Sequence, residues 1–202
     1  MPQASYRQKR YDEKQRQILE SAARLFAEKG YGQVSLEEIG AELHLSKASL
    51  YYYVKSKDDI LFQLHMQAMD QAIAVLERAQ ASALPPVEKI RTAIRDLVLI
   101  ATREDILASY RIESRFLPVE MRPQSIEKSE QLLACVHKII REGVEAGIVH
   151  CRNWRITAFA VLGAMNWIPM WYSPRGELSV DEIVLVMEEF IFRAFGIETN
   201  EN

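Results

Sequence analysis

The chain has 202 residues, 49% of them hydrophobic, with only eight glycines and seven prolines, which excludes a disordered protein and fits one large or two small globular domains. Its formal net charge of −3 does not by itself indicate a nucleic-acid partner. The charge is uneven, however, because residues 1–57 hold ten lysines and arginines against seven acidic residues, whereas the remainder holds 15 against 21. A basic N-terminal segment on an acidic body is expected where only one end of a protein meets phosphate.

Two features predict a cytoplasmic protein. The N-terminus is polar and lacks the apolar stretch of a secretory signal, and no apolar run approaches the ~20 residues of a membrane span. Cys135 and Cys151 are the only cysteines, and we expect them to be free thiols of a reducing compartment, with a disulfide or redox switch as the lesser alternative.

Helical periodicity extends along almost the whole chain, and the alternating pattern of strands is nearly absent. Serines that can cap a helix, such as Ser35, Ser46 and Ser179, and glycines that can end one, such as Gly30 and Gly196, divide the chain into segments. The sequence predicts an all-α fold of about nine helices, which span approximately residues 12–29, 35–43, 46–53, 56–80, 86–103, 106–115, 123–146, 153–171 and 179–195.

The basic residues before the first predicted helix allow two interpretations. Arg7, Lys9 and Arg10 can form a flexible arm that adds phosphate or minor-groove contacts, or a disordered tail without a function. Asp12, followed by Gln15, is expected to cap the first helix.

The second and third predicted helices have the features of a helix-turn-helix. Gly40 and Ala41 provide a small surface where the two helices cross. Apolar residues that can lock the pair together are Ile39, Leu43, Leu45, Leu50 and Val54. The later helix then presents outward Lys47, Ala48, Ser49, Tyr52 and Tyr53. The N-terminal residues of such a helix approach base edges in the major groove, and its hydroxyls and lysines contact phosphate.

A capped helix pair of this kind can also be plain core scaffolding. The run Tyr51, Tyr52 and Tyr53 favours DNA binding, because at helical spacing the three rings cannot all point inward. An exposed ring beside Lys47 and Lys55 suits a phosphate backbone.

Residues 12–62 closely resemble the DNA-binding domain of the TetR family of bacterial transcriptional regulators. The matching motifs, in order, are Ile18-Leu19, Ala22-Ala23, Leu25-Phe26, Gly30-Tyr31, Ser35-Leu36, Ile39-Gly40, Leu45-Ser46-Lys47, Leu50-Tyr51-Tyr52-Tyr53 and Lys55-Ser56-Lys57. The chain departs from the family at four positions, where His44 replaces the usual Gly, Gly40 a frequent Ala, Tyr53 a frequent His and Val54 a frequent Phe. Because histidine tolerates a left-handed backbone better than most residues, we expect the turn at His44 to form.

The resemblance implies roles for individual residues. Ser35 and Lys57 would contact phosphates through helix N-termini, and Tyr52 would reach the DNA backbone. Lys47 and Ser49 are our prediction for base-edge contacts, with Lys47 facing a guanine. The complete predicted DNA-binding set is Ser35, Lys47, Ala48, Ser49, Tyr51, Tyr52, Tyr53, Lys55 and Lys57.

The resemblance also implies a homodimer, because two recognition helices must lie about 34 Å apart on the duplex. Residues 1–56 would then form the N-terminal arm and DNA-binding domain, and residues 57–202 the effector-binding and dimerisation domain. The last helix supports this with an apolar stripe wider than one partner helix needs, although an intramolecular core is the alternative. The predicted interface, a four-helix bundle between protomers, comprises Ala160, Gly163, Ala164, Met187, Phe190, Ile191 and Ala194.

The segment 165–172 is an aromatic cluster interrupted by an asparagine and a proline, and it can form the apolar wall of an effector pocket or an ordinary core stripe. With residues 174–179 it resembles the branch of the family that responds to acyl-CoA thioesters and represses fatty-acid or steroid-ring degradation genes. The predicted effector residues are Met165, Asn166, Trp167, Met170 and Trp171, with Arg103, Arg111 and Arg115 for the CoA phosphates and Arg122 near the same opening. Nearby acidic residues that could neutralise these arginines are Glu104, Glu113 and Glu120.

The sequence therefore predicts a ligand-responsive repressor that binds a palindromic operator as a dimer and is released by an effector, an acyl-CoA thioester. Two alternatives remain open: a repressor of a multidrug-efflux gene that responds to hydrophobic drugs, and an interaction protein that keeps the fold without binding DNA.

Catalysis is not expected. Cys135 and His137 lie on roughly opposite faces of a helix, and His150 and Cys151 have no partners at metal-ligand spacing. No Gly-rich phosphate loop occurs, and the acidic pair at 37–38 is explained by a helix cap. We expect no metal and no cofactor apart from the effector.

Overall fold

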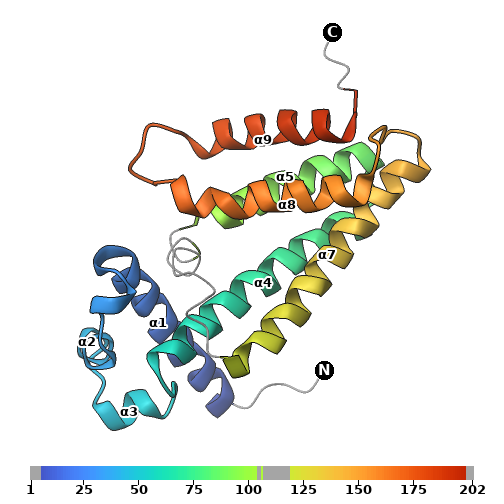
Figure 1. Cartoon of the computed structure of the whole chain (residues 1–202). Helices are drawn as coiled ribbons and strands as arrows, with labels where there is room; N and C mark the ends of the chain where they lie inside the picture. The colour runs from blue at the N-terminus through green and yellow to red at the C-terminus, as the bar shows by residue number, and fades with distance from the viewer. Residues whose placement is uncertain (1–5, 104–105, 107–118, 199–202) are drawn as a thin grey trace. The chain divides into compact units, whose positions relative to one another are not determined.

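The structure is a computed structural model that describes residues 6–103, 106 and 119–198 (Figure 1). Over these residues the chain forms eight α-helices and no strand, so the predicted all-α fold is confirmed. The helices are α1 (Tyr6–Lys29), α2 (Leu36–Glu42), α3 (Lys47–Tyr51), α4 (Lys57–Ala81), α5 (Pro86–Ala101), α7 (Arg122–Glu145), α8 (Trp154–Trp171) and α9 (Val180–Phe195), with 3-10 turns η1 (Tyr31–Gln33) and η3 (Val119–Met121). The helix predicted at residues 106–115 lies, apart from Ile106, outside the described residues.

The helix ends are where local side-chain chemistry predicts them. Ser35 Oγ accepts a hydrogen bond from the Glu38 amide at 3.1 Å, and Ser46 Oγ accepts one from the Ser49 amide at 3.2 Å. Ser179 caps α9 in the same way. Each such cap is worth about 1 kcal/mol, because it satisfies an amide that the helix leaves without a partner.

The start of α1 corrects the prediction, because the helix begins at Tyr6 and not near Asp12. Arg7, Lys9 and Arg10 are therefore helical and form neither a flexible arm nor a disordered tail. The arginine, glutamine and lysine side chains at positions 7–10 are strong helix formers. Gln8 Nε2 also donates a hydrogen bond at 2.7 Å to Asp12 Oδ1, which lies one helical turn further along. Asp12 consequently lies inside the helix and does not cap it.

The chain divides into two compact units, and the boundary falls within α4, after Met66. The first is built on Met1–Met66 and the second on Gln67–Arg103 with Pro123–Asn202. This boundary separates compact units, whereas the boundary predicted between residues 56 and 57 separates a DNA-binding from an effector-binding part. The functional boundary stays a prediction.

In the first unit α1 packs against α2, and α2 against α3. The buried side chains at the centre include Ile18, Phe26, Ile39 and Leu50, which confirms the apolar faces predicted for these helices. A Cβ added at Gly40 would lie 3.3 Å from the Leu45 carbonyl oxygen, so this glycine permits the close approach that the turn requires.

In the second unit α5 lies along α8 and α9, which also pack on each other (Figure 1). Lys128 of α7 pairs with Asp70 of α4. Lys89 Nζ of α5 lies 2.8 Å from Glu142 Oε2 of α7. Leu76, Ile139 and Phe195 are among the buried residues of this unit. None of the helices in the described ranges is long and apolar enough to cross a membrane.

Candidate DNA-binding surface and effector groove

The turn between α2 and α3 fixes the crossing of the two helices. His44 has a φ of 53°, in the left-handed region, as expected from its place in the turn. The Leu45 amide then donates to the Gly40 carbonyl oxygen at 2.8 Å. Leu50 and Val54 are buried beneath α3, so the opposite side of this short helix faces outward.

Most of the predicted DNA-binding residues lie on that outward side. Tyr52 is 64% exposed. We call the exposed members the reading surface: Ser35, Lys47, Ala48, Ser49, Tyr51, Tyr52 and Lys55. Tyr53 and Lys57 are half-buried and lie at its edge.

Lys47 of the reading surface is paired with Glu37 of α2. Its Nζ lies 2.8 Å from Glu37 Oε1, and both side chains are mostly exposed. The hydrogen bond to the lysine is the main cause that lowers the pKa of Glu37, and the same bond raises the pKa of Lys47. Sequence reasoning assigned Glu37 only to a helix start, because a contact between two helices is invisible in their separate patterns.

Lys57 turns inward and fastens the start of α4 to η1. Its Nζ donates to the backbone carbonyl oxygens of Tyr31 and Val34 at 2.7 and 3.0 Å and lies 4.3 Å from the centroid of the Tyr31 ring. The Tyr31 hydroxyl donates to Asp58. Burial and that bond both raise the pKa of Tyr31. A phosphate contact of Lys57 would therefore come from its main-chain amide at the start of α4.

Three tyrosines join α1 to the end of α3. The Tyr11 ring lies 5.6 Å from Tyr52 and 5.0 Å from Tyr53, and the latter two are 5.1 Å apart, between ring centroids. Sequence reasoning missed Tyr11 because it lay before the predicted start of the helix. Its place seven residues before the buried Ile18, two helical turns away, is the signal that could have found it.

The second unit contains a small apolar cavity of about 40 Å³. Its lining comes from α4, α5, α7, α8 and α9 and includes Leu76, Ile94, Ile139 and Met165. Of the predicted effector residues that the structure describes, Met165 alone lines this interior space.

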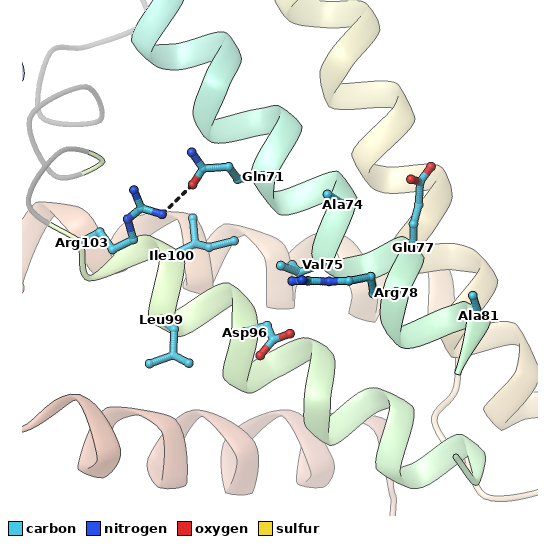
Figure 2. Close-up of a pocket in the computed structure, with 10 residues that line it drawn as sticks. All are labelled: Gln71, Ala74, Val75, Glu77, Arg78, Ala81, Asp96, Leu99, Ile100 and Arg103. Atoms are coloured by element: carbon cyan, nitrogen blue, oxygen red, sulfur yellow. Dashed lines mark hydrogen bonds between the residues drawn. The ribbon is translucent and has the colours of Figure 1, made fainter. Parts of the chain in front are cut away.

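A larger groove of about 800 Å³ lies between α4 and α5 (Figure 2). Its apolar lining consists of Ala74, Val75, Ala81, Leu99 and Ile100, and its polar lining of Gln71, Glu77, Arg78, Asp96 and Arg103. Arg103 Nη1 donates to Gln71 Oε1 at 2.8 Å. The Arg78 side chain lies beside Val75, along the groove (Figure 2). The groove therefore combines an aliphatic wall with two guanidinium groups, and sequence reasoning had named only Arg103 of the two.

The other predicted effector residues are elsewhere. Asn166, Trp167, Met170 and Trp171 are exposed on α8 and line neither the cavity nor the groove. The helix continues through Pro169 to Trp171, so the two tryptophans share one face as expected. Arg111 and Arg115 lie outside the described residues, and Arg122 is exposed at the first residue of α7.

Large apolar side chains are instead exposed together on α8 and α9. We call this set the apolar face: Ile156, Phe159, Trp167, Met170 and Trp171 of α8, and Leu185, Val186 and Phe190 of α9. Phe159 is 58% and Trp167 61% exposed. Contiguous exposed apolar residues of this kind mark interaction sites.

The predicted interface residues divide by burial. Ala160, Gly163 and Phe190 are exposed, and Ala164, Met187 and Ala194 are half-buried. Ile191 corrects the prediction, because it is only 1% exposed and lines the apolar cavity of its own chain. The apolar stripe of α9 therefore has a buried part, which includes Ile191, and an exposed part, which includes Phe190.

Among the described residues, no three His, Cys, Asp or Glu side chains form a group that could hold a metal.

Comparisons with known protein families give two matches. Residues 18–64 match the family model described as bacterial regulatory proteins, tetR family, and residues 83–195 match the one described as tetracyclin repressor-like, C-terminal domain. Together they cover the helix-turn-helix and the helices α5, α7, α8 and α9 of the second unit.

Individual relatives match at modest identity over most of their length. The structure is similar to that of AibR in complex with isovaleryl coenzyme A and operator DNA, at 30% identity and a TM-score of 0.75, over 88% of this chain and 97% of that one. It is also similar to the regulator PfmR from Thermus thermophilus, at 29% identity and a TM-score of 0.76, over 87% and 97% of the two chains. The fatty acid metabolism regulator protein of Bacillus subtilis (strain 168) is 28% identical over 132 residues, which are 65% of this chain and 68% of that protein.

Proposed function

The chain belongs to the TetR family of bacterial transcriptional regulators, and we propose that it is a dimeric repressor that binds operator DNA through its reading surface and is released by an acyl-CoA thioester. The observation that carries the DNA part is the exposed side of α3, which presents lysine, hydroxyl and tyrosine groups from a helix locked onto α2. The two free cysteines fit the reducing cytoplasm in which such a regulator meets chromosomal DNA.

We assign the residues of the reading surface by their position on α3. Lys47 and Ser49 lie in its first turn, where side chains approach base edges. Tyr52 and Lys55 lie beyond its end, where a hydroxyl and an ammonium group suit phosphate oxygens. We also assign a phosphate contact to the N-terminus of α2, which Ser35 caps.

The variant K47A/Y52A tests this assignment. It should lose binding to an operator duplex in fluorescence anisotropy while it keeps its dimer in sedimentation, because both side chains are exposed. K138A, which removes an exposed lysine of α7, is the matched control and should bind like the wild type. Unchanged binding by K47A/Y52A would favour an interaction protein of the same fold.

The groove between α4 and α5 supports an acyl-CoA effector. A thioester of CoA carries phosphates at one end and an aliphatic chain at the other, and the groove offers the Arg78 and Arg103 guanidinium groups together with Leu99 and Ile100. Its volume of about 800 Å³ suits a ligand of that class. AibR, at 30% identity, has been solved with isovaleryl coenzyme A and operator DNA together.

Calorimetry with isovaleryl-CoA tests the effector. We expect saturable binding by the wild type and a loss of about tenfold in affinity for R78Q, the order of one charged hydrogen bond. R95Q, at an exposed arginine of α5 outside the groove, is the control. A neutral hydrophobic drug, the alternative effector, would bind R78Q as well as the wild type. No binding of thioesters of any chain length would remove the acyl-CoA proposal.

α4 is the element that we propose transmits the signal. Its first residues, Lys57 and Asp58, bond to Tyr31 in the DNA-binding unit, and its later residues Gln71 and Arg78 line the groove. An effector that displaces α4 would alter the spacing of the two recognition helices. The ligand must favour the released state by about 1–3 kcal/mol for useful regulation.

A further inference from the structure

We propose that the first two turns of α1 form a rigid phosphate-binding clamp, which extends the DNA contact beyond α3 and is held in position by Tyr11. The inference rests on the proposed DNA binding and names a second contact surface for the same partner, the phosphate backbone beside the bases that α3 reads.

The first observation is the arrangement of charge on the helix. Arg7, Arg10 and Tyr11 are separated by three and four residues, so they lie on neighbouring positions of one side of α1. Arg7, Lys9 and Arg10 are all exposed.

The second observation is that other basic groups of this unit are already engaged with its own atoms. Ion pairs with acidic residues hold Arg16, Arg24, Lys29 and Lys47, and backbone carbonyl oxygens hold Lys57. Arg7 and Arg10 make no ion pair within the described part of the chain. Among the described residues of this unit, positive charge without an ion pair therefore lies at the start of α1 and, on the reading surface, at Lys55.

The third observation ties this charge to the reading surface. Tyr11 packs against Tyr52 and Tyr53 at ring-centroid distances of 5.6 and 5.0 Å. A hollow of about 880 Å³ lies between the start of α1 and these two tyrosines, and its lining includes Arg7, Lys9 and Arg10. A phosphate in this hollow would meet guanidinium groups on one side and tyrosine hydroxyls on the other.

The helical conformation lowers the entropy cost of the phosphate contact. A disordered arm must lose backbone freedom when it binds, whereas residues 6–11 are already ordered in α1. Arginine binds phosphate in a bidentate, charge-assisted manner and so suits this role. The clamp carries no base-edge contact and adds affinity without sequence preference. Tyr11 is a positioning residue, because it acts through the placement of the helix.

The salt dependence of DNA binding tests the clamp. The DNA would be a short duplex enriched by the wild-type protein from a randomised library, with an unselected duplex of equal length beside it. Each phosphate contact contributes about 0.9 to the slope of log K against log salt concentration, so R7Q/R10Q should lower the slope by about 2. R16Q/R24Q, the matched control, removes two exposed arginines of the same helix that do not line the hollow, and it should lower the slope by less than half as much.

Two further variants separate positioning from charge. Y11A should lower the slope as R7Q/R10Q does although it removes no charge, and Y11F, which keeps the ring, should restore it. Circular dichroism shows whether each variant remains helical. A slope for R7Q/R10Q equal to that of R16Q/R24Q would overturn the clamp. A full slope for Y11A in a folded protein would overturn the role of Tyr11.

The same experiment separates the clamp from the function on which it rests. If no sequence is enriched from the library, sequence-specific reading by α3 fails. The clamp is still tested on the unselected duplex, because phosphate contacts do not depend on sequence.

Discussion

At the scale of single residues, Glu37 is paired with Lys47, so we expect it to limit how much of the charge of this lysine is offered to DNA. The pair is exposed, so water screens it and a phosphate or guanine can replace the carboxylate. We predict that E37Q binds duplex DNA about three- to tenfold more tightly at low salt, because it frees Lys47 and removes a negative charge from the reading surface. E28Q, at an exposed glutamate of α1, is the control for charge alone. An affinity of E37Q no higher than that of E28Q would show that Lys47 does not contact DNA.

We predict that His65 and His137 make the free energy of unfolding dependent on pH. Burial lowers the pKa of both histidines, and Arg155 and Arg141 lower that of His137 further. The unfolded chain therefore binds protons more readily, and the free energy of unfolding should fall as the pH drops through the unfolded value of 6.5. Urea denaturation at about pH 7.5 and 5.5 measures this fall, above the range in which Glu37 and Glu38, with lowered pKa values, titrate. The variant H65Q/H137Q should show a smaller fall, and an equal fall would assign the effect to other groups.

At the scale of elements, the short recognition helix depends on its cap. α3 has five residues, too few to be stable alone, and Ser46 satisfies its Ser49 amide. We predict that S46A lowers the free energy of unfolding by about 1 kcal/mol, measured by urea denaturation, and that S46D restores it. A stability of S46A equal to that of the wild type would mean that water replaces the cap.

The elements also show what the sequence could predict. Caps such as Ser35 and Ser179 and the buried faces of the first helices act within a few residues, so their patterns are visible along the chain. The early start of α1 was missed because the sequence predicts a cap at Asp12, and the packing of Tyr11 on Tyr52 and Tyr53 is invisible in the local pattern. The DNA-binding segment was identifiable because it is local. The groove was not, since Arg78 and Arg103 come together only when α4 and α5 are placed.

The tryptophans of α8 illustrate the same limit. Their pattern is equally typical of a pocket wall, a core stripe or an interface, and only the exposure of Trp167 and Trp171 favours the interface. Ile191 shows the converse, because a residue on a suitable stripe proved to be buried within its own chain.

At the scale of the whole molecule, the apolar face predicts self-association. Phe190 is 47% exposed, so a charge there should leave the fold intact while it disrupts an apolar dimer interface. We expect F190E to sediment as a monomer with a far-ultraviolet circular dichroism spectrum like that of the wild type. L84E, at a leucine that is 43% exposed in the connection between α4 and α5 and is not part of the defined face, should remain a dimer. An F190E protein that stays dimeric would place the interface elsewhere.

The central step of the proposed function is the release of operator DNA by an effector that binds between α4 and α5. The most direct measurement is the fluorescence anisotropy of a labelled operator duplex bound to the protein, as isovaleryl-CoA is added to the wild type and to R78Q. We predict that the thioester releases the duplex from the wild type, and that R78Q needs about tenfold more. If the DNA stays bound while calorimetry shows that the thioester site is saturated, the thioester is not the signal that releases the operator.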